Sequence, residues 1–304
     1  MNNVIFKKAR VFRNIANNKF SHKLSAEQKE KILEDLKLAL GKDFKYIKLN
    51  EADQSVIKNL YTSGIINSKS TEVLLNLKTN VCIDLFNSEH ISIISSSCYN
   101  NDVYKDVKAV ADKLANKIVF AYSDEYGYLS SNLVNLGSGY QLEADICLDA
   151  ICALNKIEQV KQNINNLGYS LAETNMKSIF KMSTKCSLGL SEDELSNEFN
   201  KTLEKLLELE MESAKMLDVS NHDEIYDKVM RSFAILNSAH LINYEELSTI
   251  LIILRTGVNL GFINLTKTQL NELQMLCISA NSNLVSKSEC KELAEKIKEI
   301  LKGE

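Results

Sequence analysis

The sequence of 304 residues contains no proline and no tryptophan. At an average proline usage of about 5%, a chain of this length would hold roughly 15. The simplest account is drift in an AT-rich genome, because asparagine, lysine and isoleucine are abundant. Long apolar runs are also missing, so the sequence predicts no membrane-spanning helix. The first ten residues lack the ordered regions of a signal peptide, so the sequence predicts a cytoplasmic protein with no membrane partner.

Arginine is scarce as well. Of the 36 cationic residues only four are arginine, namely Arg10, Arg13, Arg231 and Arg255. The planar fork of arginine binds phosphate through two hydrogen bonds, whereas lysine is a mobile point charge. A phosphoryl-transfer site built from several arginines therefore cannot be assembled. The formal charge of -4 and the lack of a basic stripe interleaved with aromatic residues also argue against nucleic-acid binding.

The seven cysteines show no pattern of disulfide or metal chemistry. Their number is odd, none forms a Cys-x-x-Cys pair, and none lies near a histidine at metal-ligand spacing. We expect reduced thiols, several of them in the core. Cys147 and Cys152 lie in an apolar run, which favours buried packing over redox chemistry. No metal site is predicted.

Hydrophobic residues make up 45% of the chain, enough for one large domain and a smaller one. A capping box at Ser25–Gln28 predicts a helix that ends near Gly41. Short apolar stretches between residues 72 and 98 predict antiparallel strands joined by a tight turn. The remaining elements expected before residue 218 are helices over 103–117, 141–165 and 191–217, and strands over 168–173 and 178–188.

Everything after residue 223 reads as helix, with apolar periodicity over 224–242, 244–256, 267–279 and 286–302. We place a domain boundary at this change of pattern. The prediction is an α/β domain over residues 1–217, with an antiparallel sheet flanked by helices, and a helical domain over residues 218–304. The apolar faces of the second domain could equally serve an oligomer interface.

Several sequence blocks occur in an order that is typical of one family. Residues 7–14 read Lys-Lys-Ala-Arg-Val-Phe-Arg-Asn, residues 87–92 read Asn-Ser-Glu-His-Ile-Ser, and residues 127–139 read Gly-Tyr-Leu-Ser-Ser-Asn-Leu-Val-Asn-Leu-Gly-Ser-Gly. A further block runs from Arg255 to Gly261. Over nearly the whole chain, these blocks resemble the ATP:guanido phosphotransferases, relatives of creatine and arginine kinase, and within them the bacterial protein-arginine kinases.

The resemblance implies a fold, an activity and partners. The fold is the guanidino-kinase catalytic fold followed by a helical domain of the dimerisation type. The activity is transfer of the γ-phosphate of ATP, with Mg²⁺, to arginine in proteins. The implied setting is the stress-response and Clp-protease quality-control system, with a kinase activator or Clp components as partners and a homo- or heterodimer formed through the helical domain.

The resemblance also assigns site residues. Lys8 and Arg10 occupy the first two positions at which the family contacts nucleotide phosphate, and Glu89 occupies the position of the carboxylate that orients and deprotonates the guanidinium. Ser92 and Gln141 stand where the family has phosphate-binding arginines. Cys290 and Ala294 stand at the two positions near the C-terminus where the family has phosphoarginine-binding arginines.

The replaced arginines leave three hypotheses open. Transfer from ATP depends on cationic clamps, and the loss of one costs on the order of 10³ to 10⁵ in rate. The first hypothesis is a catalytically impaired kinase, or pseudokinase, that acts by protein binding. The second is an active guanidino or protein-arginine kinase with a rebuilt phosphate site. The third is a remnant with no retained role.

Each candidate also has a plainer interpretation. Glu89 and His90 could form a solvated pair at a strand turn instead of a catalytic site. For Arg13 we expect a structural ion pair, and for Arg231 and Arg255 a carboxylate partner or a helix terminus. The remaining histidines are read as ordinary surface or packing residues.

Overall fold

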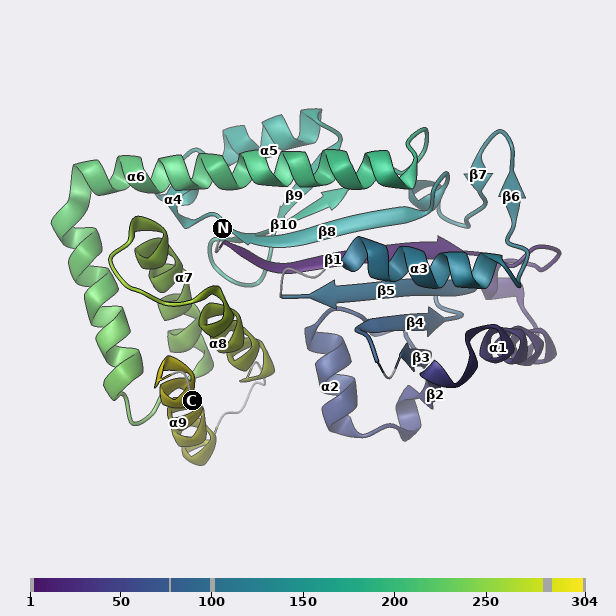
Figure 1. Cartoon of the computed structure of the whole chain (residues 1–304), viewed down its shortest axis with the longest axis horizontal. Helices are drawn as coiled ribbons and strands as arrows, with labels where there is room; N and C mark the ends of the chain where they lie inside the picture. The colour runs from purple at the N-terminus through teal and green to yellow at the C-terminus, as the bar shows by residue number, and fades with distance from the viewer. Residues whose placement is uncertain (1–2, 77, 99–101, 281–285, 303–304) are drawn as a thin grey trace. The chain divides into compact units, whose positions relative to one another are not determined.

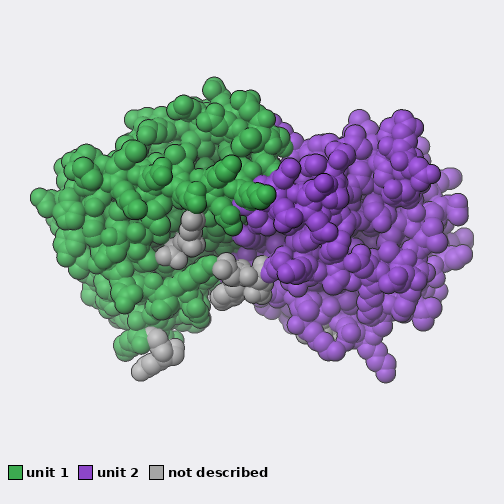
Figure 2. Space-filling view, turned by 45° about the horizontal axis from the view of Figure 1, so that its top comes forward, with its two compact units in different colours: residues 1–6, 144–182, 201–304 green, residues 7–143, 183–200 purple. Residues whose placement is uncertain are grey.

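The computed structural model describes residues 3–76, 78–98, 102–280 and 286–302. Figure 1 labels its helices and strands. The chain divides into two compact units, each of which gathers into one continuous mass of side chains in Figure 2. Unit 1 comprises residues 1–6, 144–182 and 201–304, and unit 2 comprises residues 7–143 and 183–200.

Unit 2 is built on antiparallel strands in the order β2-β3-β4-β5-β1. The antiparallel strands predicted between residues 72 and 98 are therefore confirmed. Runs rich in valine and isoleucine favour strands because branched side chains pack well on a pleated surface. The strand bounds are β1 Val4–Arg13, β2 Phe44–Lys48, β3 Glu72–Asn76, β4 Val81–Leu85 and β5 Ile91–Ser97.

Helices pack on the strands of unit 2. The predicted capping box starts α1 (Ala26–Leu40), because the Ser25 hydroxyl accepts from the Gln28 amide and the Gln28 side chain accepts from the Ser25 amide. Helix α3 (Val103–Ala115) packs on β5 and against α1. Helix α2 (Gln54–Thr62) contributes Leu60 to an apolar cluster that includes side chains of β3, β4 and β5. Unit 2 thus matches the predicted antiparallel sheet flanked by helices.

The glycine-rich segment forms a hairpin and a turn of 3-10 helix. Strands β6 (Tyr122–Ser123) and β7 (Gly127–Tyr128) pair antiparallel, and the 3-10 helix covers Leu133–Asn135. Gly137 and Gly139 have positive φ angles of 103° and 67°. A Cβ atom on Gly139 would lie 2.6 Å from an Arg13 nitrogen, so this position needs glycine for both reasons.

In unit 1, one expectation from the sequence is wrong. Residues 141–165 do not form a single helix: they begin in strand β8 (Tyr140–Cys147) and continue in helices α4 (Asp149–Ala153) and α5 (Ile157–Asn166). Along β8 buried and half-buried residues alternate, which is the period of a strand. The two predicted strands that follow are confirmed as β9 (Tyr169–Glu173) and β10 (Ile179–Thr184), in the order β8-β10-β9.

The rest of unit 1 is helical. Helix α6 (Glu192–Ser238) contains a break at Asn221, whose φ and ψ of -141° and 40° are not helical. The domain boundary predicted after residue 217 falls just before this break and stays a prediction. Helices α7 (Tyr244–Leu260), α8 (Lys267–Ala280) and α9 (Lys287–Lys302) follow. Their buried side chains form one apolar cluster that includes Leu251, Leu254, Leu273 and Ile297.

None of the helices in the described ranges combines the length and the apolar character needed to span a membrane.

Candidate functional site

The register of β1 against β5 places the predicted phosphate-contact residues on one face of the sheet. Lys8 lies opposite Ser96, Arg10 opposite Ile94, and Phe12 opposite Ser92. On β4, Cys82 continues the row of Arg10 and Asp84 continues the row of Phe12. Residues two apart on a strand share a face. We call this surface the Arg10 face and define it by six side chains: Lys8, Arg10, Asp84, Ser92, Ser96 and Glu143.

Lys8 is paired with a carboxylate on this face. Its Nζ lies 3.4 Å from Oε2 of Glu143, and the two side chains are only 11% and 21% exposed. Gly64 approaches so closely that a Cβ atom there would lie 2.4 Å from the Lys8 ammonium. The positive charge of Lys8 is therefore offset within the fold, and backbone partly covers it.

Arg10 is held loosely by comparison. Its Nη2 lies 3.5 Å from the carbonyl oxygen of Gly64, and its guanidinium carbon lies 5.9 Å from the ring centre of Phe12. Among the described residues, no group accepts a hydrogen bond from the Arg10 Nε, although this atom is buried. A buried donor without an acceptor costs about 1–3 kcal/mol.

Two more polar atoms on the same face are unmatched within the described ranges, Oδ1 of Asp84 and Oγ of Ser96. The other oxygen of Asp84 accepts from Ser70 and Asn87, at 2.9 Å each. Burial raises the pKa of Asp84 above its ordinary value, although these hydrogen bonds and the charge of Arg10 act in the opposite direction.

Ser92 and Gln141 are uncharged side chains at two positions where the resemblance to the family predicts phosphate-binding arginines. Ser92 is buried in β5. The side-chain amide of Gln141 donates to Oδ1 of Asn135 at 2.8 Å, so it is engaged with the glycine-rich segment. Positions 92 and 141 therefore add no cationic clamp to Lys8 and Arg10.

Arg13 makes the structural ion pair that was expected. Its side chain is only 3% exposed and lies 3.2 Å from a carboxylate oxygen of Glu192. Nη1 donates to the carbonyl oxygens of Phe12 and Ser138, and the guanidinium stacks 3.5 Å from the ring centre of Tyr128. Burial lowers the pKa of Arg13. This arginine anchors the glycine-rich segment to β1.

The interpretation of Glu89 as part of a solvated pair is wrong, because the side chain is 1% exposed. Its carboxylate accepts hydrogen bonds from the Asn14 amide, from the hydroxyls of Ser130 and Ser131, and from the Ser131 backbone N–H. Both carboxylate oxygens are thus engaged by the protein itself.

His90, beside Glu89, is also fully buried and matched. Its Nδ1 accepts from the Ile15 backbone N–H at 2.9 Å, and its Nε2 lies 2.7 Å from the carbonyl oxygen of Lys19. These contacts fit a neutral ring that carries its proton on Nε2, and burial lowers the pKa of His90. We call Asn14, Glu89, His90, Ser130 and Ser131 the Glu89 cluster.

The remaining predicted positions lie in α9 of unit 1. Cys290 is half-buried, and its carbonyl oxygen accepts from the Ile242 N–H at 3.3 Å. Ala294 is 2% exposed and belongs to the apolar cluster of the helices. Neither side chain can hold a phosphorylated arginine through charge.

The other two arginines have internal partners. Arg231 pairs with Asp227 one helical turn away, as expected. Arg255 is 2% exposed and donates to Oε1 of Gln274 at 3.2 Å, so this contact is with an amide where a carboxylate or a helix terminus was expected. Within the described part of the chain, no group of three histidine, cysteine, aspartate or glutamate side chains could hold a metal ion.

Comparison with known proteins adds two matches to family models. Residues 24–213 match the model described as ATP:guanido phosphotransferase, C-terminal catalytic domain. Residues 222–304 match the model described as protein-arginine kinase McsB C-terminal domain. The interval between the matches contains residue 217, the predicted end of the first domain, and Asn221, where α6 breaks.

Individual relatives agree with these matches. A protein-arginine kinase from Clostridium tetani is 26% identical over 324 residues, covering 99% of this chain and 95% of the relative. Another, from Staphylococcus haemolyticus, is 25% identical over 251 residues, covering 78% and 75%. They agree with the resemblance drawn from the sequence blocks.

Solved structures show the same fold at lower identity. A lombricine kinase is 17% identical with a TM-score of 0.59, over 68% of this chain and 66% of that chain. The duplicated taurocyamine kinase from Schistosoma mansoni, with bound transition state analog components, is 17% identical with a TM-score of 0.62, over 81% of this chain and 38% of that one. The chain thus spans slightly less than two thirds of the first structure and well under half of the second.

Proposed function

Because the chain belongs to the ATP:guanido phosphotransferase family, we propose that it is a catalytically impaired relative of the protein-arginine kinases that acts by binding proteins. The observation that carries the proposal is the charge balance of the Arg10 face. Its six defining side chains include two cations, Lys8 and Arg10, and two acids, Asp84 and Glu143. A triphosphate needs a surplus of positive charge, which this face does not supply.

The residues present are therefore a poor fit for ATP and its Mg²⁺. Lys8 is ion-paired with Glu143, and the backbone at Gly64 lies against Lys8 and accepts a hydrogen bond from Arg10. The resemblance assigns the role of base to Glu89, but four donors already engage its carboxylate. A base must be within hydrogen-bond reach of the proton that it takes, with an oxygen lone pair available for it.

A phosphoryl-transfer assay with labelled ATP, Mg²⁺ and an arginine-rich protein substrate tests the proposal. We expect no phosphoarginine above the level without protein. Phosphoarginine that forms with the natural chain and disappears in the Arg10→Met variant would overturn it. Thermal melts of both proteins show whether the variant is folded.

The protein partners remain part of the proposal. By resemblance they are a second copy or an active kinase of the family, a kinase activator, or Clp-protease components in a stress response. The helical residues 218–304, proposed as a separate domain, and the adjoining turns of α6 offer a surface: Met216, Val219 and Tyr226 are 55%, 90% and 44% exposed. Light scattering of the chain, alone and mixed with an active relative, should reveal a complex larger than the monomer.

A second candidate is an active kinase with a rebuilt phosphate site. The observation in its favour is the Arg10 Nε, which is buried and finds no acceptor among the described residues. A phosphate oxygen would supply one. ATP with Mg²⁺ should then raise the melting temperature, since a ligand that binds only the folded protein stabilises it. No shift at millimolar ATP removes this candidate.

A further inference from the structure

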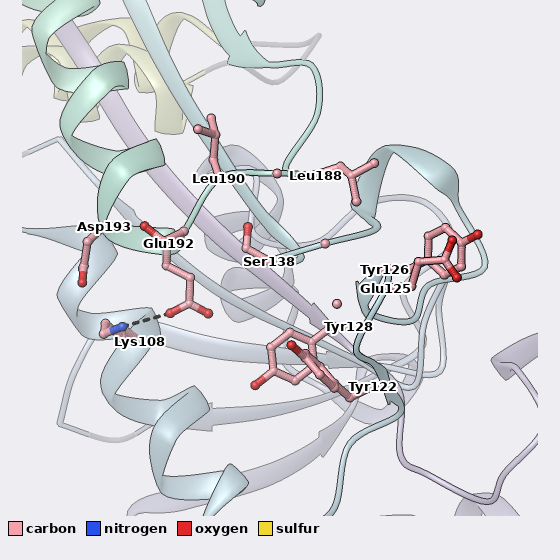
Figure 3. A pocket seen from close by; sticks show the side chains of 14 residues that line it. Lys108, Tyr122, Glu125, Tyr126, Tyr128, Ser138, Leu188, Leu190, Glu192 and Asp193 are labelled. Atoms are coloured by element: carbon pink, nitrogen blue, oxygen red, sulfur yellow. Dashed lines mark hydrogen bonds and ion pairs between the residues drawn. The ribbon is translucent and has the colours of Figure 1, made fainter.

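A pocket of about 470 Å³ lies beside the glycine-rich segment in unit 2. The β6-β7 hairpin forms one wall, Gly137 and Ser138 lie at its base, and the loop before α6 forms the opposite wall with the first residues of that helix. Figure 3 shows its side chains from close by. The family resemblance assigned no role to the hairpin or to the loop.

The charged side chains that line this pocket are mostly acidic. Three of them are acidic, Glu125, Glu192 and Asp193, and one lining side chain is cationic, Lys108. The Lys108 ammonium lies 2.9 Å from Glu192, as the dashed line in Figure 3 marks, and Arg13 binds the other oxygen of the same carboxylate. Lys108 and Arg13 are therefore both engaged with Glu192. Asp193 accepts a hydrogen bond from the Tyr104 hydroxyl, and Glu125 and Asp193 are both exposed to solvent. An anionic ligand would be repelled here, and a cationic ligand would be attracted.

Three tyrosines supply flat surfaces around these carboxylates. Tyr122 and Tyr126 are 59% and 45% exposed, so their rings are open to a ligand. Tyr122 packs edge-on against Tyr128 with ring centres 5.3 Å apart. Tyr128 already stacks with the Arg13 guanidinium, so one ring of the group binds a cation within the fold. Cations are attracted to the faces of tyrosine rings, at exposed sites as well as buried ones.

We propose that the pocket binds a lysine or arginine side chain from a basic segment of a partner protein. The ammonium or guanidinium would lie at the exposed Tyr126 ring, within reach of the Glu125 carboxylate, which Figure 3 shows beside that ring. This inference rests on the proposed function, because it gives a chain that acts by protein binding the chemistry of its partner. It requires no reaction and no nucleotide.

Fluorescence anisotropy with labelled nine-residue peptides tests the pocket at low salt. Oligolysine and oligoarginine should bind with saturation, and oligoglutamate should not. The variant Glu125→Gln with Tyr126→Leu should weaken cationic binding about 10-fold, since it removes one ion pair and one cation–π contact. The tighter of the two cationic peptides identifies the side chain that the pocket prefers.

A matched control makes the same chemical changes near α2, where Glu51 is exposed and Tyr61 is 47% exposed. Glu51→Gln with Tyr61→Leu should leave peptide affinity unchanged. Equal weakening in both double variants, or no binding of either cationic peptide, overturns the proposal. If the pocket variant melts at a lower temperature than the natural chain, peptide binding is measured with Glu125→Lys instead. This variant reverses a single charge on the exposed hairpin and should weaken binding of the cationic peptides.

The two proposals fail in different ways. Phosphoarginine formation overturns the impaired-kinase proposal whether or not peptides bind. Absent peptide binding overturns the pocket and leaves the impaired-kinase proposal standing. Peptide binding that persists in Arg10→Met separates the pocket from the Arg10 face.

Discussion

The Glu89 cluster and the Arg10 face lie in the same unit, but they differ in how well their polar groups are matched. In the Glu89 cluster, both carboxylate oxygens, both ring nitrogens of His90 and both ends of the Asn14 amide have partners. On the Arg10 face, the Arg10 Nε, the Asp84 Oδ1 and the Ser96 Oγ have none within the described residues. Buried polar groups are normally hydrogen-bonded, so the second pattern is the unusual one.

The difference separates two reasons for keeping a polar residue. A matched cluster stabilises the fold whether or not any chemistry takes place, and Glu89 joins β1, the turn between β4 and β5, and the glycine-rich segment. An unmatched face costs stability and calls for another explanation, such as a ligand or a past function. The same unit can therefore retain a family residue for folding and lose the family's cationic clamps.

The largest effect is expected from Glu89→Ala. It leaves the Asn14 amide and the Ser130 and Ser131 donors without their buried acceptor, and each such group costs about 1–3 kcal/mol. We expect a loss of about 3 kcal/mol in the free energy of unfolding. Urea denaturation followed by circular dichroism measures it.

Glu89→Gln is the matched control for this prediction, because glutamine keeps the shape and one acceptor oxygen. It should lose clearly less stability than Glu89→Ala. A loss below about 1 kcal/mol for the alanine variant would contradict a structural role for the cluster and make Glu89 available for chemistry again.

The Glu89 cluster also shows where a sequence stops predicting a site. Glu89 lies 75 positions from Asn14 and 41 from Ser130. No local pattern joins residues at such distances, so its burial was missed. A signal was present, because Asn14, Ser130 and Ser131 all lie in the sequence blocks that resemble the family. Contacts between Glu89 and these three residues could have been predicted from that.

The strands between residues 72 and 98 were predictable, because short apolar runs and turn residues alternate there. Strand β8 was not, because Leu142 and Ile146 are four positions apart and fit a helical stripe as well as an alternating strand. The helices α4 and α5 that follow extended the ambiguous pattern. Hydrogen bonds to neighbouring strands decide between a helix and a strand here, and the local pattern of apolar residues does not predict those hydrogen bonds.

A pH measurement sharpens the comparison through Asp84. Burial raises its pKa, so above its ordinary value of about 4 the folded protein binds more protons than the unfolded chain, and stability falls as pH rises toward the raised pKa. Asp84→Asn removes this titrating group. The stability of the variant relative to the natural chain should therefore rise as pH increases above about 4.

Asp43 supplies a control of opposite sign. A hydrogen bond and the charge of Lys78 lower the pKa of Asp43, which is exposed. Asp43→Asn should therefore lose stability relative to the natural chain as pH rises through the acidic range. Parallel curves for the two variants would contradict the assignment of Asp84 to an unmatched face.

The smallest effect is expected from Arg10→Met, which removes the less well matched of the two cations on the Arg10 face while keeping an unbranched apolar stem. The substitution removes a buried Nε donor that has no acceptor within the described residues, and this gain offsets the lost contact with Gly64. We therefore expect a change within about 1 kcal/mol in urea denaturation. Lys8→Met is the matched comparison and should lose more, since it leaves Glu143 without its ion-pair partner at 3.4 Å. If Arg10→Met instead loses about as much as Glu89→Ala, then Arg10 belongs to a matched network, and the contrast between the two regions disappears.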